Sequence, residues 1–381
     1  MDFSLSDEQQ QIVASVRAFA RDELRPKYAY WDRNDEFPRE LWPKMGALGL
    51  FGLRVPEAHG GLGADCVTAG LAIEATAVGD FNVCYGILNC SLIGDILAKF
   101  ASESVRREWL APMIAGEKVL CVCLTEPHCG SDAAAIRTRA VRRGDSYVLN
   151  GEKSAITLLM VGDAAVVFAK TDPGAGAKGV SAFLVPLAAK GVSRHPYSDM
   201  GARGIVRGSL FLQDVEIPAE NLIGPEGGGF SRVMQAFDYT RALIGMMCLG
   251  AAQATVDETI EYLKQRTAFG KPLPNYQGVT FPLAERAAEM DMARWLCLRT
   301  LWLRDQELPH TKEAAMCKMQ APLIATRAVH ECLILHGHYG YTKDFPVEQR
   351  LRDVIGQEIA DGTPQIMKMV VARAMFGREF V

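Results

Sequence analysis

The feature that most constrains the fold of this chain is the order of three blocks with different residue periodicities. From residue 5 to about residue 120, apolar residues such as Ile12, Val16 and Phe19 recur at helical spacing. Short apolar and β-branched runs separated by turn residues follow, and long helical patterns complete the chain. Because strands and helices do not alternate, this order is unlike a Rossmann-type parallel sheet.

We therefore predict a mainly α fold with a central β domain. The predicted boundaries are a helical domain at 1–120, a compact β domain at 121–228 and an antiparallel four-helix bundle at 229–381. Strands are expected at 147–149, 165–168, 180–185 and 209–217, with turns at 150–151, 172–174 and 201–204. The bundle helices are expected at 232–265, 276–306, 311–335 and 363–376.

Charge and composition exclude several classes of function. The formal net charge is −4 and the pI is about 6.0, which gives no electrostatic basis for binding nucleic acid or an anionic membrane. No run of about 18 apolar residues occurs, and the polar N-terminus is unlike a signal peptide. The ten cysteines lack metal-ligand spacing, so we expect no metal site and reduced, mostly buried thiols in a cytoplasmic protein.

The stretch from Glu358 to Ile366 carries a candidate functional carboxylate. Thr363 is a good N-cap and Pro364 suits the first position of a helix, which we expect to continue to about Phe376. Asp361 stands on a glycine-containing turn just ahead of that helix N-terminus, a place suited to a base that must reach a ligand. An ordinary aspartate near a helix start is the alternative. The residues of this helix expected to be buried are Ile366, Met369, Val370, Ala372 and Ala374.

Five motifs in order carry a family resemblance. They are 124–132 (LTEPHCGSD), 150–153 (NGEK), 214–218 (DVEIP), 266–271 (RTAFGK) and 361–366 (DGTPQI). Together they resemble the acyl-CoA dehydrogenase family over essentially the whole chain. The resemblance implies an N-terminal helical domain, a β-barrel-like middle domain and a C-terminal four-helix bundle. It also implies bound FAD, a homotetramer, an acyl-CoA substrate and an electron-transferring flavoprotein as acceptor.

The family chemistry gives the carboxylate a role. A thioester acidifies its α-carbon, and a carboxylate removes the α-proton while the β-hydrogen leaves as hydride to flavin N5. By resemblance Asp361 occupies the position of that base, where most members carry Glu. Some members place the base at the position of Thr240, and a threonine cannot do that work.

The resemblance also assigns binding residues. Arg266, Phe269 and Gln277 are expected to contact the FAD of a neighbouring subunit, and Asp238 with Arg241 is expected to meet CoA. A solvated helix-end charge for Arg266, and a plain helix N-terminal charge for Asp238, remain the alternatives. The full cofactor set is Leu124, Thr125, Ser131, Ile156, Thr157, Arg266, Phe269, Gln277, Gly337, Thr363 and Gln365. The substrate set is Ser131, Asp238, Arg241, Ala360 and Gly362.

Several positions depart from the family pattern and suggest a substrate. Asp361 is shorter than Glu by one bond, roughly 1.5 Å, and Ala360 stands where Tyr is common. A bulky branched or alicyclic acyl group, such as cyclohexanecarboxyl-CoA, would fill that space and bring its α-carbon closer to the base. Three more departures are Ala155 for a Trp beside the flavin, and Ile334 and His338 near the adenine end.

Two other functions fit the same fold. One is a dehydrogenase acting on an acyl-carrier-protein thioester. The other is a non-catalytic flavoprotein that binds DNA, which would need a basic surface. The acidic net charge and the short C-terminal end at 378–381 disfavour the DNA-binding alternative.

Overall fold

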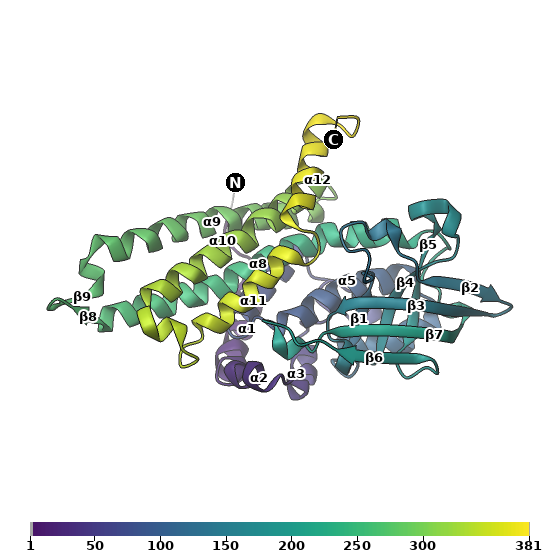
Figure 1. The fold of residues 1–381 in the computed structure, drawn as a ribbon, viewed down its shortest axis with the longest axis horizontal. Coiled ribbons are helices and arrows are strands. Elements are labelled where there is room, and N and C mark those ends of the chain that lie inside the picture. Colours follow the sequence, from purple (N-terminus) through teal and green to yellow (C-terminus); the bar gives the residue numbers. More distant parts are fainter. Residues whose placement is uncertain (1–2, 381) are drawn as a thin grey trace.

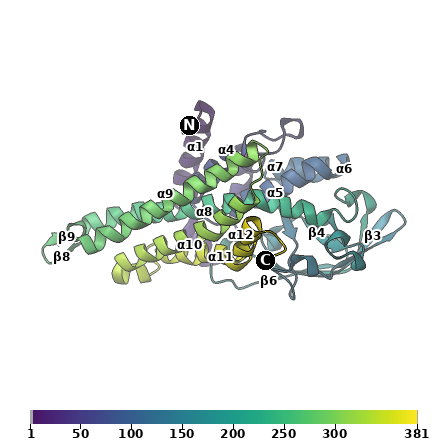
Figure 2. The ribbon, with the colours of Figure 1, turned by 90° about the horizontal axis from the view of Figure 1, so that it is seen from above.

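The structure, a computed structural model, describes residues 3–380. It confirms a helical part, a sheet and a second helical part in that order along the chain (Figure 1). The bundle and the sheet lie along the long axis of the molecule, and the N-terminal helices cover one side of both (Figure 2). The N-terminal helices are α1 (Asp7–Phe19), α2 (Tyr28–Asn34), α3 (Trp42–Ala47), α4 (Cys66–Ala77), α5 (Cys84–Phe100), α6 (Glu103–Val105) and α7 (Ala111–Ile114).

The N-terminal helices form from clear local signals. At the start of α1 the Gln9 backbone N–H donates to the Ser6 hydroxyl at 3.2 Å, and the Ser6 N–H donates to the Gln9 side chain at 3.2 Å. This is the capping box that the sequence predicts. Helices α4 and α5 are apolar on nearly all sides and are therefore buried. Helix α4 packs on α1, α8 and α9, whereas α5 contacts α8 and the first strand.

The middle part is a 7-stranded sheet. Six of its strands lie in the order β1-β4-β2-β3-β7-β6, and β5 pairs with β4 outside this order. Its strands are β1 (Leu120–Cys123), β2 (Arg139–Arg143), β3 (Ser146–Ile156), β4 (Ala164–Lys170), β5 (Val180–Pro186), β6 (Val192–Pro196) and β7 (Gly208–Pro218). The sequence did not predict β1, β2 or β6. Strands β2 and β6 are short and mostly solvated, so they lack the apolar alternation that marks a half-buried strand.

The predicted turn at Asn150-Gly151 is wrong, because β3 runs through it. The register between β3 and β7 shifts here, which marks a β-bulge. The Asn150 amide donates to the Asp214 carboxylate at 3.0 Å and accepts the Asp214 N–H at 2.8 Å. A Cβ on Gly151 would lie 2.5 Å from the Thr138 hydroxyl, so the glycine permits a close approach of strands rather than a reversal.

The C-terminal bundle consists of α8 (Gly229–Gln265), α9 (Gln277–Asp305), α10 (Thr311–Leu335) and α11 (Val347–Ile359). The sequence does not predict α11, and the prediction that the last helix, α12 (Pro364–Phe376), is the fourth member is wrong. Helix α11 buries polar residues, among them Arg350, Asp353 and Gln357, so its inner face does not read as apolar. Helix α12 packs mainly on the end of α10 and projects from the bundle (Figure 1).

Burial on α12 also differs from the prediction. Only Met367 is buried; Ile366, Met369, Val370 and Ala372 are half-buried, and Ala374 is exposed. A helix that contacts one neighbour covers a narrower face than a helix inside a bundle. The thiol prediction is confirmed, since all ten cysteines are free and buried. Within residues 3–380, no helix combines the length and apolarity needed to cross a membrane.

Candidate functional site

Asp361 lies on the turn that joins α11 to α12. Its φ is 50° and that of Gly362 is 107°, both in the left-handed region. Such a backbone costs a non-glycine residue on the order of 1–3 kcal/mol and persists only where its surroundings fix it. The predicted start of the following helix is confirmed, since the Ile366 N–H donates to the Thr363 hydroxyl at 3.4 Å and Pro364 occupies the first turn.

Buried side chains from two other helices hold this turn. The Lys318 ammonium of α10 donates to the carbonyl oxygens of Gln357 at 2.5 Å and Gly362 at 3.1 Å. The Gln357 side-chain amide donates to the Tyr85 hydroxyl of α5 at 2.7 Å. The backbone is therefore tied on both sides of Asp361 by residues distant in sequence.

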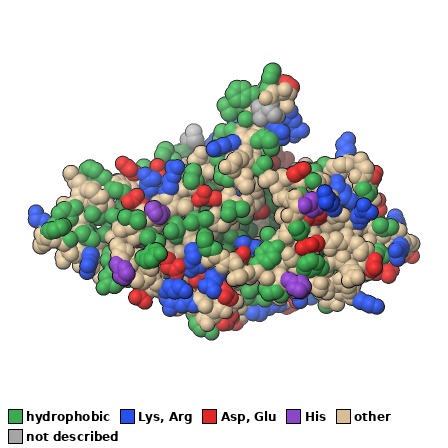
Figure 3. All heavy atoms as spheres, viewed as in Figure 1, with side chains coloured by type: hydrophobic (Ala, Val, Ile, Leu, Met, Phe, Trp, Pro, Cys, Tyr) green, Lys and Arg blue, Asp and Glu red, His purple; other side chains and the backbone are tan. Residues whose placement is uncertain are grey.

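The Asp361 carboxylate is open to the outside of the protein, yet protein atoms surround it on its other sides. Figure 3 shows a hollow between the bundle and the sheet, below the projecting C-terminal helix. Removal of water by the surrounding protein raises the pKa of Asp361, and the positive charges of Lys318, Arg241 and Arg207 oppose that rise. The result is a carboxylate that a ligand can reach and that is a stronger base than a free aspartate.

The predicted substrate residues of α8 lie beside the same turn. The Arg241 guanidinium pairs with Asp238 at 2.9 Å, and the Thr311 hydroxyl donates to Asp238 at 2.7 Å. A Cβ on Gly362 would lie 4.0 Å from an Arg241 nitrogen, so this arginine reaches the turn. Thr240 is buried and donates to the Phe237 carbonyl of its own helix at 3.5 Å.

The sheet contributes a second group of predicted residues. Thr125 and Thr157 are half-buried, and among residues 3–380 neither hydroxyl has a protein hydrogen-bond partner. The Ser154 N–H donates to the Thr125 carbonyl at 3.0 Å, which joins the two segments. Leu124 and Ile156 are buried, and the Leu124 carbonyl already accepts a hydrogen bond from the Lys153 ammonium. Ser131 is exposed on the loop that follows.

A buried ion pair that the site prediction did not include supports this loop. The Lys153 ammonium donates to the Glu126 carboxylate at 2.7 Å and to the Leu124 carbonyl at 3.0 Å. Glu126 also accepts the backbone N–H groups of Arg137 and Thr138 at 2.6 and 3.0 Å. Burial pushes the pKa of Glu126 upward, but the Lys153 charge and these hydrogen bonds outweigh it and leave the pKa below its usual range.

The Glu126 carboxylate also lies near His128 and Cys129, a grouping that could hold a metal ion. Two facts argue that it is structural. The carboxylate is already used by Lys153 and two backbone donors, and burial raises the pKa of the Cys129 thiol rather than favouring a thiolate ligand.

The remaining predicted cofactor residues lie at the opposite end of the bundle. Arg266 and Phe269 belong to the arm, a hairpin of β8 (Thr267–Ala268) and β9 (Lys271–Pro272) that links α8 to α9 (Figure 1). Phe269 is 96% exposed, and the Arg266 guanidinium has no acceptor among residues 3–380. Gln277 starts α9, and Gly337 follows His336, which stacks on Tyr262 near the end of α8 at 4.3 Å.

The structure thus divides the predicted cofactor residues into two groups. One group consists of the unpaired hydroxyls of Thr125 and Thr157, which follow strands β1 and β3, and of Thr363 and Gln365, which follow Asp361 at the start of α12. The unpaired guanidinium and the exposed ring lie on the arm. A flavin dinucleotide needs hydroxyl or amide donors around its ring and a cation at its pyrophosphate. Both kinds of donor are present and fit FAD, but the two groups of one chain lie at different ends of the bundle (Figure 1).

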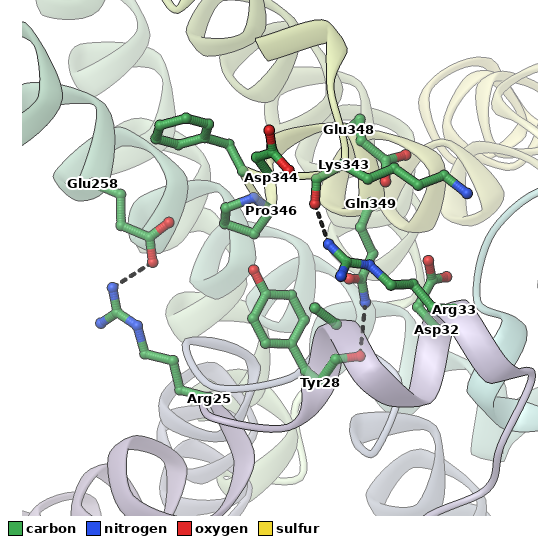
Figure 4. Close-up of a pocket in the computed structure, with 12 residues that line it drawn as sticks. Arg25, Tyr28, Asp32, Arg33, Glu258, Lys343, Asp344, Pro346, Glu348 and Gln349 are labelled. Carbon is green, nitrogen blue, oxygen red and sulfur yellow. Dashed lines mark hydrogen bonds and ion pairs between the residues drawn. The ribbon is translucent and has the colours of Figure 1, made fainter. Parts of the chain in front are cut away.

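The two cavities described in the chain do not contain Asp361. One, of about 330 Å³, lies between α2, α8 and the start of α11 (Figure 4). Several of its charges are already paired, for example Arg25 with Glu258 at 2.5 Å. The other, of about 410 Å³, includes Asp238 and Thr311 next to Asp95 and Arg304. Of the predicted residues, only Asp238 lines either cavity.

The departures at positions 155, 334 and 338 lie in exposed places. Ala155 has a φ of 57°, and its N–H donates to the Tyr197 hydroxyl at 3.3 Å. Ile334 and His338 are exposed near the arm end of the bundle. The predicted site did not include Lys153, Lys318 or Arg207. A signal existed for Lys318, because it shares helical spacing with Ala314, Ala321 and Ala325 and so falls on an apolar face.

Comparisons with known proteins agree on one family over the whole chain. Sequence profiles described as the N-terminal, middle and C-terminal domains of acyl-CoA dehydrogenase match residues 6–117, 121–215 and 227–376. The mitochondrial short-chain specific acyl-CoA dehydrogenase of Mus musculus is 39% identical over 371 residues, which are 97% of this chain and 90% of that protein.

Two further comparisons are informative. The subunit CarC of the caffeyl-CoA reductase-Etf complex of Acetobacterium woodii is 36% identical, over 96% of this chain and 98% of that protein. The solved structure of butyryl-CoA dehydrogenase from Megasphaera elsdenii superimposes with a TM-score of 0.95 at 33% identity, over 98% of this chain and all of that one.

Proposed function

This chain belongs to the acyl-CoA dehydrogenase family, and we propose that Asp361 is the base that removes the α-proton of its acyl-CoA substrate. The family membership makes the chain an FAD-dependent oxidoreductase acting on a CH–CH bond. The observation that carries the proposal is the placement of Asp361. It is a reachable carboxylate held in a left-handed turn, surrounded by protein and faced by three positive charges.

The reaction balances with one base and one hydride acceptor. Asp361 takes the α-proton, the β-hydrogen leaves as hydride, and a carbon–carbon double bond forms between the two carbons. FAD, when bound, supplies the hydride acceptor. Lys318, Arg241 and Arg207 favour the ionised carboxylate before the transfer. Thr125 and Thr157 offer hydroxyls that can orient the flavin ring, and Arg266 offers its guanidinium to the pyrophosphate.

We further propose a branched or alicyclic acyl group as the preferred substrate. Asp361 is short, and the small Ala360 precedes it on the same turn. A bulky group would fill the space left by Ala360 and bring its α-carbon to the shorter base, where a misplacement of about 1 Å can cost on the order of 10²-fold in rate. The names of the mouse and Megasphaera relatives favour a short linear group instead, and this is the alternative to be tested.

We propose an electron-transferring flavoprotein as the acceptor and a homotetramer as the working assembly. Support for the acceptor comes from the Acetobacterium woodii relative, which is named as a subunit of a complex with such a flavoprotein. Support for the assembly comes from the two separated groups of cofactor residues. An exposed apolar stripe on α9, formed by Phe281, Met292, Trp295 and Trp302, offers further surface for a second copy.

Anaerobic bleaching of the bound flavin tests the reaction and the substrate together. The panel is cyclohexanecarboxyl-CoA, its 1-ene, isobutyryl-CoA, butyryl-CoA and octanoyl-CoA, and the rate constant of bleaching is measured for each. We expect the ring and branched substrates to be fastest. A clear preference for octanoyl-CoA would refute the proposed preference for a bulky acyl group, and a wild-type rate in Asp361→Asn would refute the assignment of the base.

A further inference from the structure

Lys318 is a buried charge that the proposed reaction does not by itself require. It is 1% exposed and lies on the apolar face of α10 among small residues. An unpaired ammonium at such a depth is costly, so a lysine is retained there only where its donors and its charge are used. The groups around Lys318 show how its donors and its charge are used.

Both hydrogen bonds of the Lys318 ammonium go to the backbone around Asp361. The Gln357 carbonyl, at 2.5 Å, belongs to the last turn of α11, where carbonyl oxygens have no partner within the helix. The Gly362 carbonyl, at 3.1 Å, belongs to the residue directly after the base. One side chain therefore joins the end of α11 to the far side of the strained turn, and it fixes the position of the residue between them.

The charged and titratable groups around this pair come from four parts of the chain. Asp361 is faced by Lys318 of α10, Arg241 of α8 and Arg207 before β7. Lys318 is in turn faced by Asp361, by Cys248 and Arg241 of α8, and by Glu358 of α11. Burial lowers the pKa of Lys318, and the Asp361 charge counteracts that effect. Among these groups, Lys318 alone also hydrogen-bonds the backbone next to Asp361.

We propose that Lys318 is a positioning residue for the base: its two hydrogen bonds fix the turn that carries Asp361, and its charge favours the ionised carboxylate. The proposal rests on the assignment of Asp361 as the base, and it concerns a residue that would not itself touch the reacting atoms.

Two substitutions separate the hydrogen bonds from the charge. Lys318→Gln keeps amide donors for the carbonyl oxygens but removes the charge, whereas Lys318→Met removes both. Lys170→Met is the matched control, because Lys170 is also a buried lysine that donates to a backbone carbonyl, that of Gly176, in the sheet part of the chain. All variants are purified with FAD, and the flavin content and melting temperature are measured first.

The readout isolates proton removal from hydride transfer. Acetyl-CoA has α-hydrogens but no β-carbon, so the holoenzyme can exchange its α-hydrogens with D₂O but cannot desaturate it. Mass spectrometry gives the exchange rate per bound flavin as a function of pH. The rate of the wild-type enzyme rises with pH as Asp361 ionises. Loss of a neighbouring positive charge disfavours ionisation, so it moves this rise to higher pH.

The expected results differ between the two variants. Lys318→Gln should approach the wild-type rate at high pH and fall about 10-fold behind it below the rise. Lys318→Met should show the same displaced rise and, in addition, a plateau lowered by about 10²-fold because the turn is no longer fixed. Lys170→Met should keep the wild-type profile. A residue that only stabilises the fold would change the melting temperature without displacing the rise.

Either of two results would overturn the proposal. One is a wild-type pH profile in Lys318→Gln together with a wild-type plateau in Lys318→Met; the other is an equal displacement in Lys170→Met. If Lys318→Met fails to retain FAD, the profile of Lys318→Gln decides alone. Asp361→Asn distinguishes a failure of the proposed role of Lys318 from a failure of the proposed role of Asp361 as the base. Full exchange in Asp361→Asn means that the base is elsewhere, whereas lost exchange there with unchanged Lys318 variants refutes only the role of Lys318.

Discussion

The two regions that we propose bind the cofactor and the substrate are built in opposite ways. The base turn, residues 357–363, is strained but tied by Lys318 and Tyr85 through buried hydrogen bonds. The arm, residues 266–272, extends from the end of the bundle with Phe269 96% exposed and Arg266 without a partner among the described residues. One region is complete within the chain, and the other offers its side chains outward.

This difference suits the base turn to proton removal and the arm to retention of the cofactor. A base must be held within a fraction of an ångström of its target, so buried contacts within a single chain suit it. Contacts to the far end of a long dinucleotide tolerate more variation in position, and another subunit can supply them. Burying a side chain such as Phe269 stabilises a contact by about 1.5–3 kcal/mol. This free energy favours packing of the arm on a second copy of the chain. We therefore expect lesions in the two regions to have separable effects.

The largest effect is expected from Asp361→Asn. The amide keeps the shape of the side chain but cannot accept the α-proton. General-base catalysis contributes about 10²–10⁴-fold, so the rate of flavin reduction should fall at least 10²-fold. Stopped-flow absorbance measures the rate, and the absorbance of released flavin measures FAD content. FAD content should be unchanged; a variant that loses FAD along with its rate would break the separation of the two regions.

The arm predicts the opposite pattern for Arg266→Ala. Loss of a charge-assisted hydrogen bond costs about 1.5–3 kcal/mol, so FAD should dissociate about 10- to 100-fold more readily. At saturating FAD the reduction rate should stay near that of the wild-type enzyme. Equilibrium titration of the FAD-free protein measures the affinity. Lys264→Ala is the control, since Lys264 is an exposed cation two residues away that pairs with Glu261 at 2.6 Å. An equal loss of affinity in that variant would mean that general charge, not the arm, binds the cofactor.

Mixing the two variants sharpens the comparison. In a site shared between chains, a mixed assembly of Asp361→Asn and Arg266→Ala chains has one site with both lesions and one site with neither. At FAD concentrations too low to fill the Arg266→Ala protein, random pairing should give about a quarter of the wild-type activity. Each variant alone should be nearly inactive under those conditions. Turnover with an artificial electron acceptor after co-expression is the measurement. No recovery from a mixed assembly confirmed by mass spectrometry would place both groups of residues in the same chain's site.

The same contrast explains how much the sequence could predict. The start of α12 depends on two adjacent residues, Thr363 and Pro364. It was predicted correctly, as was the placement of Asp361 on the turn ahead of this helix. Helix α11 was missed because its buried residues are polar and find partners far along the chain. Arg350, for instance, pairs with Glu258 of α8 at 2.7 Å. Lys318 was missed for the same reason, since Gln357 lies 39 residues away.

Local signals thus predict elements whose contacts are local, and they fail where long-range polar contacts override the apolar pattern. The division of the cofactor residues could not be predicted from spacing alone. Phe269 and Thr157 become separated only when α8 extends away from the sheet as one continuous helix (Figure 1). The exposed ring on the arm is a signal that only the structure shows.

The smallest effect is expected from Asp361→Glu, which keeps the base and lengthens it by one methylene. If the turn seats a bulky substrate close to a short base, the longer side chain crowds the α-carbon. Reduction by cyclohexanecarboxyl-CoA should then fall severalfold, while butyryl-CoA is unaffected or improved. Adding Ala360→Tyr to Asp361→Glu should lower the rate with cyclohexanecarboxyl-CoA further, because a ring at position 360 narrows the space beside the turn. A change of a few atoms beside a bound substrate shifts the discrimination between two substrates by about 10-fold or more. The ratio of kcat/KM for the two substrates is the measurement, since it cancels changes in the amount of folded enzyme. If Asp361→Glu is faster on both substrates, the aspartate is a tolerated replacement and the tight hold on the turn serves the base without selecting the acyl group.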